Sequence, residues 1–294
     1  MKKLIPIFLL SMAFLVTCKK PTNIESGFAE VNGTQLYFEV AGSGDPIVLI
    51  HGNYGDSRHW DDQFEVFAKE YKVIRYDVRG YGKSSVPVEG GAYSHPDDLK
   101  ALLEYLGISK AHITGFSMGC VIAVDFVLTY PDMSNSLIAV GPWVSGFRSP
   151  LAQEVYDDFR EVSSILKESG IEPARDFLVD LHYLRPSKPI PDVNKRMEEI
   201  IHDFSFWTFT HKDLQRRLSP PAIQQLDKLN LPTLILTSDH DIEACKEVAD
   251  LLERTIPNSR KTVIADASHI SMLEKPVEFN KAILDFLDFV RNGQ

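Results

Sequence analysis

Short strand-like runs alternate with longer segments in which apolar residues recur every three or four positions. Three such runs, at residues 47–50, 72–76 and 111–114, are each followed by a helical pattern before the next run begins. Runs of this length suit strands that are buried on both faces of a parallel sheet. Parallel strands need right-handed helical crossovers. The pattern therefore predicts an α/β fold, with a mostly parallel central sheet flanked by helices.

A hairpin and a helical insertion complete the predicted organisation. Asn32-Gly33 separates two strand patterns, and this dipeptide is a strong signal for a tight turn between antiparallel strands. Between residues 147 and 221, helical patterns follow one another with no strand signal between them, and strand patterns then resume. We therefore predict a core formed by residues 28–146 and 222–294, with residues 147–221 inserted as a helical lid.

The first residues of the chain differ in composition from the rest. Two lysines precede a stretch, residues 4–16, in which only a proline and a serine interrupt apolar side chains. This is the outline of a secretory signal peptide, which we place at residues 1–17. The apolar run is shorter than the ~18 to 20 residues that a membrane-spanning helix needs, and a short transmembrane anchor is the alternative.

Cys18 follows this run directly. Leu15-Val16-Thr17-Cys18 resembles the lipobox of bacterial lipoproteins, in which the cysteine is acylated and becomes the mature N-terminus. The resemblance implies lipid attachment at Cys18 and an exported protein that is anchored to a bacterial membrane in the cell envelope. Residues 18–27 are then predicted to form a tether between the anchor and the folded body.

Composition narrows the classes of partner. The chain has 294 residues, of which 44% are hydrophobic, enough to bury a large core. Its net charge of -10, without a cluster of Lys and Arg in the body, argues against nucleic-acid binding. Cys120 and Cys245 lack the spacing of a disulfide framework or a metal site, so we predict no metal. The sequence does not indicate an oligomeric state.

The motif Gly-Phe-Ser-Met-Gly, centred on Ser117, joins the strand pattern at residues 111–114 to a helical pattern. A serine on so sharp a strand-to-helix turn has strained dihedral angles and an exposed hydroxyl, and the two glycines avoid a collision between strand and helix. The backbone N–H of Met118 opens the helix and is a candidate donor to an oxyanion. The sequence predicts Ser117 as a nucleophile. A glycine-rich turn with an exposed serine is the alternative.

A serine nucleophile needs a histidine base, and the base needs a carboxylate that orients it. Asp241 and His269 each lie just past the end of a predicted strand, as Ser117 does. Because the carboxyl ends of parallel strands meet at one edge of a sheet, we expect the three side chains to converge there. His240 is the main alternative to His269 as the base, and Asp239 is the main alternative to Asp241 as the acid.

A second oxyanion donor is expected from the loop after residues 47–50. This loop begins with His51-Gly52-Asn53, and we predict that the backbone N–H of Asn53 acts together with that of Met118. The alternative is that Asn53 only forms a turn. His51 is predicted to fix the conformation of this loop and not to act as the base.

With these residues placed, the chain resembles the α/β-hydrolase superfamily, in particular its branch of small serine esterases, enol-lactonases and carbon–carbon hydrolases. The resemblance covers about residues 28–290. It rests on His51-Gly52-Asn53, the glycine-punctuated loop at residues 77–84, the Ser117 motif, Asp241 and His269. It implies the order nucleophile, acid, base along the chain. Some relatives have an aspartate at this sharp turn, and it forms an ester with an alkyl carbon. The serine found here favours acyl chemistry instead.

The resemblance implies a serine hydrolase that cleaves a small carboxylic ester or lactone, with a small-molecule acyl substrate and no cofactor. Cleavage of a carbon–carbon bond, or of an amide at a peptide N-terminus, is the alternative within the same fold. An N-terminal aminopeptidase would need lid carboxylates such as Glu154, Asp157 and Asp158 to hold the substrate amine. A non-catalytic lipoprotein that binds a ligand under the lid is a third possibility.

Four aromatic residues could line an apolar acyl pocket or could equally form the core of the lid. They are Trp143, Tyr183, Phe206 and Trp207.

Overall fold

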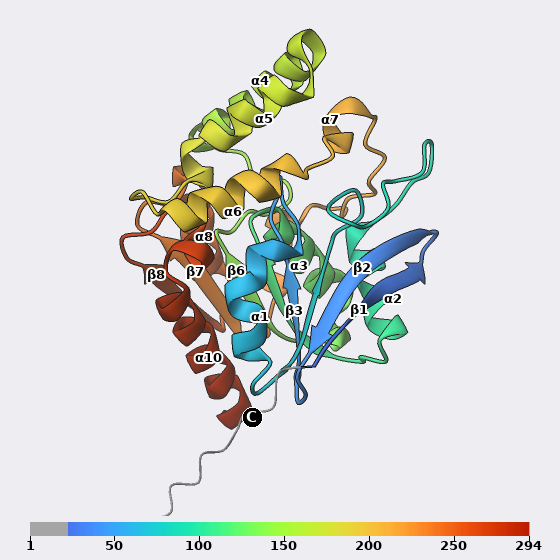
Figure 1. Cartoon of the computed structure of the whole chain (residues 1–294). Helices are drawn as coiled ribbons and strands as arrows, with labels where there is room; N and C mark the ends of the chain where they lie inside the picture. Colours follow the sequence, from blue (N-terminus) through green and yellow to red (C-terminus); the bar gives the residue numbers. More distant parts are fainter. Residues whose placement is uncertain (1–22, 294) are drawn as a thin grey trace, which may run out of the picture.

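A computed structural model describes residues 23–293 of the chain (Figure 1). Its centre is one eight-stranded sheet with the strand order β1-β2-β4-β3-β5-β6-β7-β8. Strand β2 is antiparallel to both of its neighbours, and all later pairs are parallel. The strands are β1 Ile24–Val31, β2 Thr34–Ala41, β3 Pro46–Ile50, β4 Lys72–Tyr76, β5 Ala111–Phe116, β6 Ser134–Val140, β7 Thr233–Ser238 and β8 Ser259–Ile264. The predicted α/β fold with a mostly parallel sheet is confirmed.

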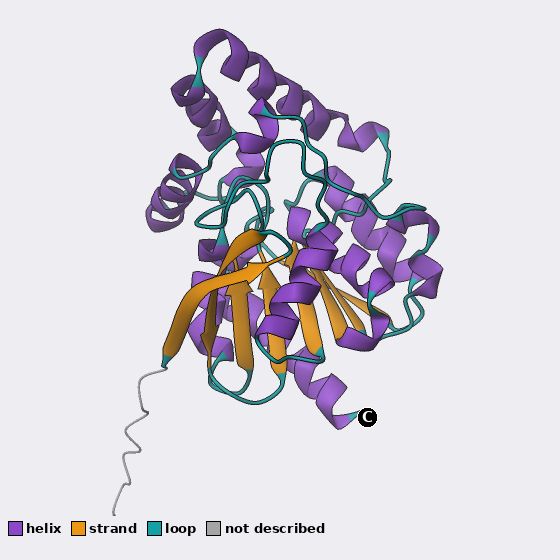
Figure 2. Cartoon of the chain, turned by 90° about the vertical axis from the view of Figure 1, so that its right-hand side faces the viewer, coloured by secondary structure: helices purple, strands orange, loops and turns teal. Residues whose placement is uncertain are grey.

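Helices flank this sheet, and a second group of helices lies beyond one end of it (Figure 2). Helix α1 packs against α10, and α2 packs against α3. The flanking helices are α1 Asp61–Phe67, α2 His95–Tyr105, α3 Met118–Thr129, α8 Glu243–Thr255, α9 Ser271–Glu274 and α10 Pro276–Asn292. Between β6 and β7 the chain forms α4 Gln153–Ser169, α5 Ile171–Asp180, α6 Pro191–His202 and α7 Trp207–Thr210. We refer to residues 147–221, which contain these last four helices, as the lid.

The central strands have the burial expected of a parallel sheet. Every residue of β5 and β7 is buried, and so are residues 47–50 of β3. Helices on both faces remove these side chains from water, which is why the strands appear in the sequence as apolar runs without alternation. The carboxyl ends of β3, β5, β7 and β8 therefore form a rigid edge from which loops can present polar side chains.

The first strand is longer than predicted. Strand β1 begins at Ile24, which pairs with Ala41 of β2, so residues 24–27 belong to the sheet and not to a tether. Residues 24–26 are exposed, and an exposed edge strand lacks the apolar alternation by which strands are recognised. The predicted signal peptide, the lipid attachment at Cys18 and the rest of the tether as far as residue 22 lie outside the described residues. None of the helices within residues 23–293 combines the length and the apolar character needed to span a membrane.

Candidate active site

Ser117 lies on the turn between β5 and α3. Its dihedral angles are φ 52° and ψ −111°, a conformation that is rare and costly for a residue other than glycine. Its backbone N–H donates to Val140 O at 2.9 Å, and its carbonyl accepts from Cys120 N at 2.9 Å. Bonds to the neighbouring strand and to the following helix therefore hold the strained residue in place.

The two glycines of the motif are required by close backbone contacts. A Cβ atom on Gly119 would lie 2.3 Å from the carbonyl oxygen of Ile50, and one on Gly115 would lie 2.1 Å from the carbonyl oxygen of Gly119. Both distances are shorter than any van der Waals contact. Only glycine lets the start of α3 approach β3 and β5 closely enough to form the sharp turn.

We expect Gly119→Ala to lower the free energy of unfolding by about 3 kcal/mol, because the added methyl group meets backbone that cannot move aside. Urea unfolding followed by circular dichroism measures the change. Gly27→Ala is the matched control, since a Cβ there would lie 3.4 Å from its nearest neighbour, the ring of Phe38. An equal loss in both variants would contradict the backbone contact as the cause.

His269 and Asp241, the residues predicted as base and acid, contact each other through a short hydrogen bond. His269 Nδ1 donates to Asp241 Oδ1 at 2.6 Å, and both side chains are almost fully buried. The carboxylate also accepts from Thr237 Oγ1 at 3.0 Å and from the backbone N–H of Ile242 at 2.8 Å. These bonds fix the carboxylate and place the ring proton on Nδ1, which leaves Nε2 of His269 free to accept a proton.

Asp239 and His240, the alternative acid and base, lie in surroundings that differ from those of Asp241 and His269. Asp239 accepts from the backbone N–H groups of Asp266 at 2.9 Å and Ala267 at 3.2 Å, so it shapes the loop that carries His269. The His240 ring is exposed, and its Nε2 lies 3.9 Å from the Asp239 carboxylate. The geometry therefore favours Asp241 and His269 over this second pair.

The loop after β3 is held by buried polar contacts. His51 Nδ1 donates to Gly52 O at 2.7 Å, and His51 Nε2 accepts from the backbone N–H of Val78 at 3.0 Å. Burial lowers the pKa of His51, so its imidazole is neutral. Gly52 N donates to His59 Nδ1 at 3.3 Å. The side chains of His51 and His59 thus fix the backbone that leads to Asn53.

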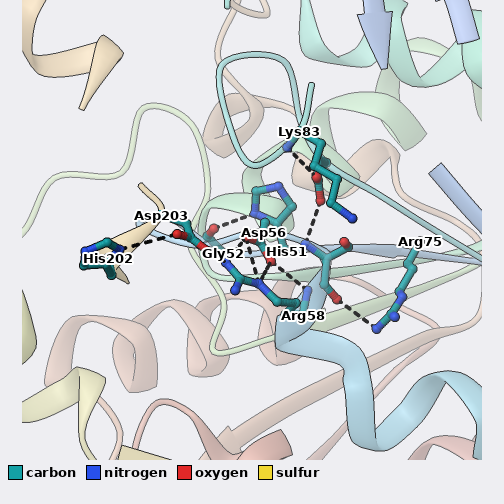
Figure 3. A network of polar contacts seen from close by, with 10 residues as sticks. His51, Gly52, Asp56, Arg58, Arg75, Lys83, His202 and Asp203 are labelled. Atoms are coloured by element: carbon teal, nitrogen blue, oxygen red, sulfur yellow. Dashed lines mark hydrogen bonds and ion pairs between the residues drawn. The ribbon is translucent and has the colours of Figure 1, made fainter. Parts of the chain in front are cut away.

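An ionic network extends from this loop to the lid (Figure 3). The Arg58 guanidinium donates to Asp56 and also pairs with Asp203, at 2.6 Å and 2.9 Å respectively. Asp203 directly follows α6 of the lid. Arg58 therefore ties the loop that carries Asn53 to the helical insertion above it.

The predicted nucleophile, base and oxyanion donors border one cavity of about 530 Å³, whereas Asp241 is not among the described residues that line it. Ser117, His269, Asn53 and Met118 all line it, and the His269 ring packs on Phe116 with ring centroids 4.8 Å apart. Within residues 23–293, no hydrogen bond joins the Ser117 hydroxyl to His269. Such contacts are often long in a structure without substrate and shorten when the substrate binds. The cavity nevertheless brings a serine, a buried histidine–aspartate pair and a helix N-terminus together.

A family model described as alpha/beta hydrolase fold matches residues 45–276 of the chain. The chain belongs to this family.

The proteins that are similar to this chain are named for the hydrolysis of different kinds of bond. A protein from Pseudomonas savastanoi, provisionally named carbamate hydrolase RutD, is 24% identical over 82% of this chain and 93% of its own length. A proline iminopeptidase from Saccharolobus solfataricus is 26% identical, covering 91% of this chain and 94% of its own. The structure of a thermophilic esterase from Thermogutta terrifontis superposes with a TM-score of 0.77 at 27% identity, over 90% of this chain and 99% of that one. The chain is therefore a hydrolase of the α/β fold.

Of the four aromatic residues predicted to line the cavity or to form the core of the lid, two do the first and two do the second. Trp143 and Tyr183 line the cavity. Phe206 is fully buried against Phe204, with ring centroids 4.7 Å apart, and Trp207 stacks on His211 at 5.0 Å. Phe206 and Trp207 thus belong to the packing of the lid and not to the cavity wall.

Three further aromatic residues of the cavity wall give no signal in the sequence. Phe159 of α4 and Phe209 of α7 stack with ring centroids 5.8 Å apart, and Tyr54 packs on both. All three line the cavity. Phe159 and Phe209 lie in helices whose patterns indicate burial without indicating the neighbour, and Tyr54 lies in a loop without a pattern, so no sequence signal assigns them to the cavity.

Asp125 of α3 also borders the cavity, and the sequence does carry a signal for it. It is the single charged residue of an otherwise apolar helix. Burial raises the pKa of its carboxyl from 3.8 to about 6, against the opposing effects of a hydrogen bond from Ser145 and the charge of Arg217. A buried acid of this kind is typical of functional sites.

We expect Asp125→Asn to stabilise the hydrolase at pH 8 by about 1–3 kcal/mol. The pKa of Asp125 is higher in the folded chain than in the unfolded chain, so ionisation destabilises the fold. The penalty is complete above about pH 6 and absent below 3.8. Thermal unfolding of the variant and the parent should therefore differ at pH 8 and converge near pH 4. An equal difference at both pH values would contradict this origin.

Proposed function

We propose that the protein is a serine hydrolase that cleaves a small carboxylic ester or lactone through an acyl-enzyme. One observation carries the proposal: Ser117, on a strained strand-to-helix turn, borders the same cavity as a histidine whose Nδ1 bonds a buried carboxylate at 2.6 Å. Nucleophile, base and acid have separate positions at the carboxyl ends of β5, β8 and β7. This combination suits acyl transfer.

In the proposed mechanism, His269 Nε2 takes the proton of the Ser117 hydroxyl as the oxygen attacks the carbonyl carbon. The backbone N–H groups of Met118 and Asn53 donate to the oxyanion that forms. His269 then protonates the leaving alcohol, and Asp241 stabilises the imidazolium in between. A water molecule, deprotonated by the same ring, releases the acid from Ser117.

The cavity wall supports an ester or lactone as the substrate. Val121 and Ile122 of α3 lie beside the nucleophile, and Phe159 and Phe209 of the lid complete an apolar surface that suits an acyl chain. An N-terminal aminopeptidase would need lid acids such as Glu154, Asp157 and Asp158 to face the substrate, and none of these three is among the described residues that line the cavity. Asp213 is a lid acid that does line it, and it already accepts from Tyr93 Oη at 2.8 Å.

A fluorophosphonate probe tests the proposal on the full-length chain. Such a probe phosphonylates a serine only where the hydroxyl is activated by a base. We expect stoichiometric labelling of the parent and of Ser145→Ala, whose hydroxyl also borders the cavity, and no labelling of Ser117→Ala. An unlabelled parent would favour a non-catalytic binding protein, and a labelled Ser117→Ala chain would assign the chemistry to another residue.

A further inference from the structure

Asp125 is buried in a place where an ionised carboxylate is unfavourable. Its side chain is 5% exposed, and eleven other residues of α3 carry no charge. One carboxylate oxygen, Oδ1, accepts from Ser145 Oγ at 2.9 Å. Within residues 23–293, the carboxylate is in no ion pair, and Oδ2 accepts no hydrogen bond. A buried charge without a partner is retained only at a cost in stability, which indicates that its partner comes from elsewhere.

Four other ionisable residues that line the cavity, Asp213, Arg217, His95 and Arg148, are either paired or neutral. Asp213 accepts from Tyr93 Oη at 2.8 Å, and Arg217, whose side chain is 73% exposed, lies 3.4 Å from Asp213. Burial lowers the pKa of His95 to about 3, so its ring is neutral. Arg148 donates to the carbonyl of Phe147 at 2.9 Å. Among these four residues, only the charge of Arg217 affects the pKa of Asp125. Because Arg217 also pairs with Asp213, its charge is divided between two carboxylates.

Asp125 and Ser117 stand on the same helix at a defined separation. Asp125 lies eight residues after Ser117, which corresponds to roughly 12 Å along the helix axis. Both residues line the cavity, with Val121 and Ile122 between them. The cavity therefore has a reactive end at Ser117, an apolar middle and a far end that carries the Asp125 carboxylate, which we call the acidic end.

We propose that Asp125 binds a protonated amine at the far end of the substrate's acyl chain, about two helical turns from the carbonyl that Ser117 attacks. This inference rests on the proposed function, because Ser117 defines the reacting end. An ammonium group supplies the charge and the donor that the carboxylate lacks. The amine of a peptide N-terminus is too close to the scissile carbonyl to reach Asp125. The substrate class is thus an ester of an ω-amino acid with a medium-length chain.

Matched substrates test this recognition in the full-length chain. p-Nitrophenyl 8-aminooctanoate carries the amine, and p-nitrophenyl octanoate does not. We expect the KM of the parent to be lower for the amino ester than for the octanoate. Asp125→Asn should raise the KM of the amino ester relative to that of the octanoate at least tenfold, while the kcat of the amino ester relative to that of the octanoate changes little. Asparagine keeps an oxygen that can accept from Ser145. Asp132→Asn, exposed just after α3, is the control and should leave both ratios unchanged.

A binding measurement separates this inference from the proposed function. Calorimetric titration with octylammonium needs no hydrolysis, and we expect binding to the parent that Asp125→Asn weakens at least tenfold. Without ester hydrolysis, such Asp125-dependent binding would still support the acidic end while the proposed function fails. Hydrolysis of both esters with an unaltered KM ratio in Asp125→Asn would overturn the inference alone. An equally low KM for p-nitrophenyl 8-hydroxyoctanoate would also overturn the inference, because a neutral hydroxyl would then bind as well as the ammonium group.

Discussion

Replacing Ser117 by alanine is expected to lower kcat for p-nitrophenyl esters by roughly 10⁵- to 10⁶-fold, to the small residual rate that binding and oxyanion donors supply alone. The side chain of Ser117 borders the cavity, and its backbone conformation is fixed by Val140 and Cys120. Alanine keeps those backbone bonds and removes one oxygen atom. The midpoint of thermal unfolding should therefore change little while turnover is lost.

Initial-rate measurements at saturating substrate check the loss, with thermal unfolding measured on the same preparations. Ser145→Ala is the control, because its hydroxyl borders the same cavity but bonds Asp125. We expect this control to keep most of its turnover of unsubstituted acyl esters. Activity retained by Ser117→Ala would remove the nucleophile from the mechanism, and equal losses in both variants would point to a disturbed cavity.

The region around Ser117 could be predicted because its causes are local. A strand pattern, a helical pattern and two glycines lie within a few residues of each other, and the sharp turn follows from sterics. Asp241 and His269 lie far away in sequence, but the rule that parallel strands end at one sheet edge predicts that they lie near Ser117. The 2.6 Å contact between them could not be read from the pattern, since it depends on loop conformations such as the one Asp239 holds.

The helices between β6 and β7 follow from the sequence pattern, but the directions of their faces do not. Their patterns indicate apolar faces, and the direction of each face depends on the packing of α4 to α7 against one another. Phe206 and Trp207 consequently lie in the lid's own packing, whereas Phe159 and Phe209 reach the cavity. Aromatic residues of equal hydrophobicity give the same signal in both places.

Asp125 carries a signal that apolar periodicity does not detect. Periodicity predicts the helix after Ser117, but it treats a single carboxylate as an interruption. The energetic argument is the opposite: a charge within an apolar helix must be compensated or functional. The start of β1 at Ile24 shows the converse limit, because an exposed edge strand carries no burial pattern to detect.

Asp241→Asn is expected to lower kcat about 10⁴-fold at pH 7 while the fold stays intact. Thr237 Oγ1 would still donate to the remaining side-chain oxygen, whereas an amide nitrogen in place of Oδ1 would lose the bond from Ile242 N–H. Asparagine, however, has an amide group that can donate to His269 Nδ1, so the ring would carry its proton on Nε2 and could not accept one from Ser117. It would also lose the negative charge that stabilises the imidazolium. The test is a comparison of kcat for a p-nitrophenyl ester between the variant and the parent.

Asp239→Asn is the matched control, because both carboxylates follow β7 and either could be the acid on sequence grounds. Asp239 accepts from two backbone amides of the loop before His269, and an asparagine oxygen can retain one of these bonds. We expect a loss of turnover within about tenfold, since a loosened loop shifts the ring without changing its tautomer. A large loss in Asp239→Asn beside a small one in Asp241→Asn would transfer the acid to Asp239. The 2.6 Å bond between Asp241 and His269 would then be structural, and the ring would have to turn before it could act as a base.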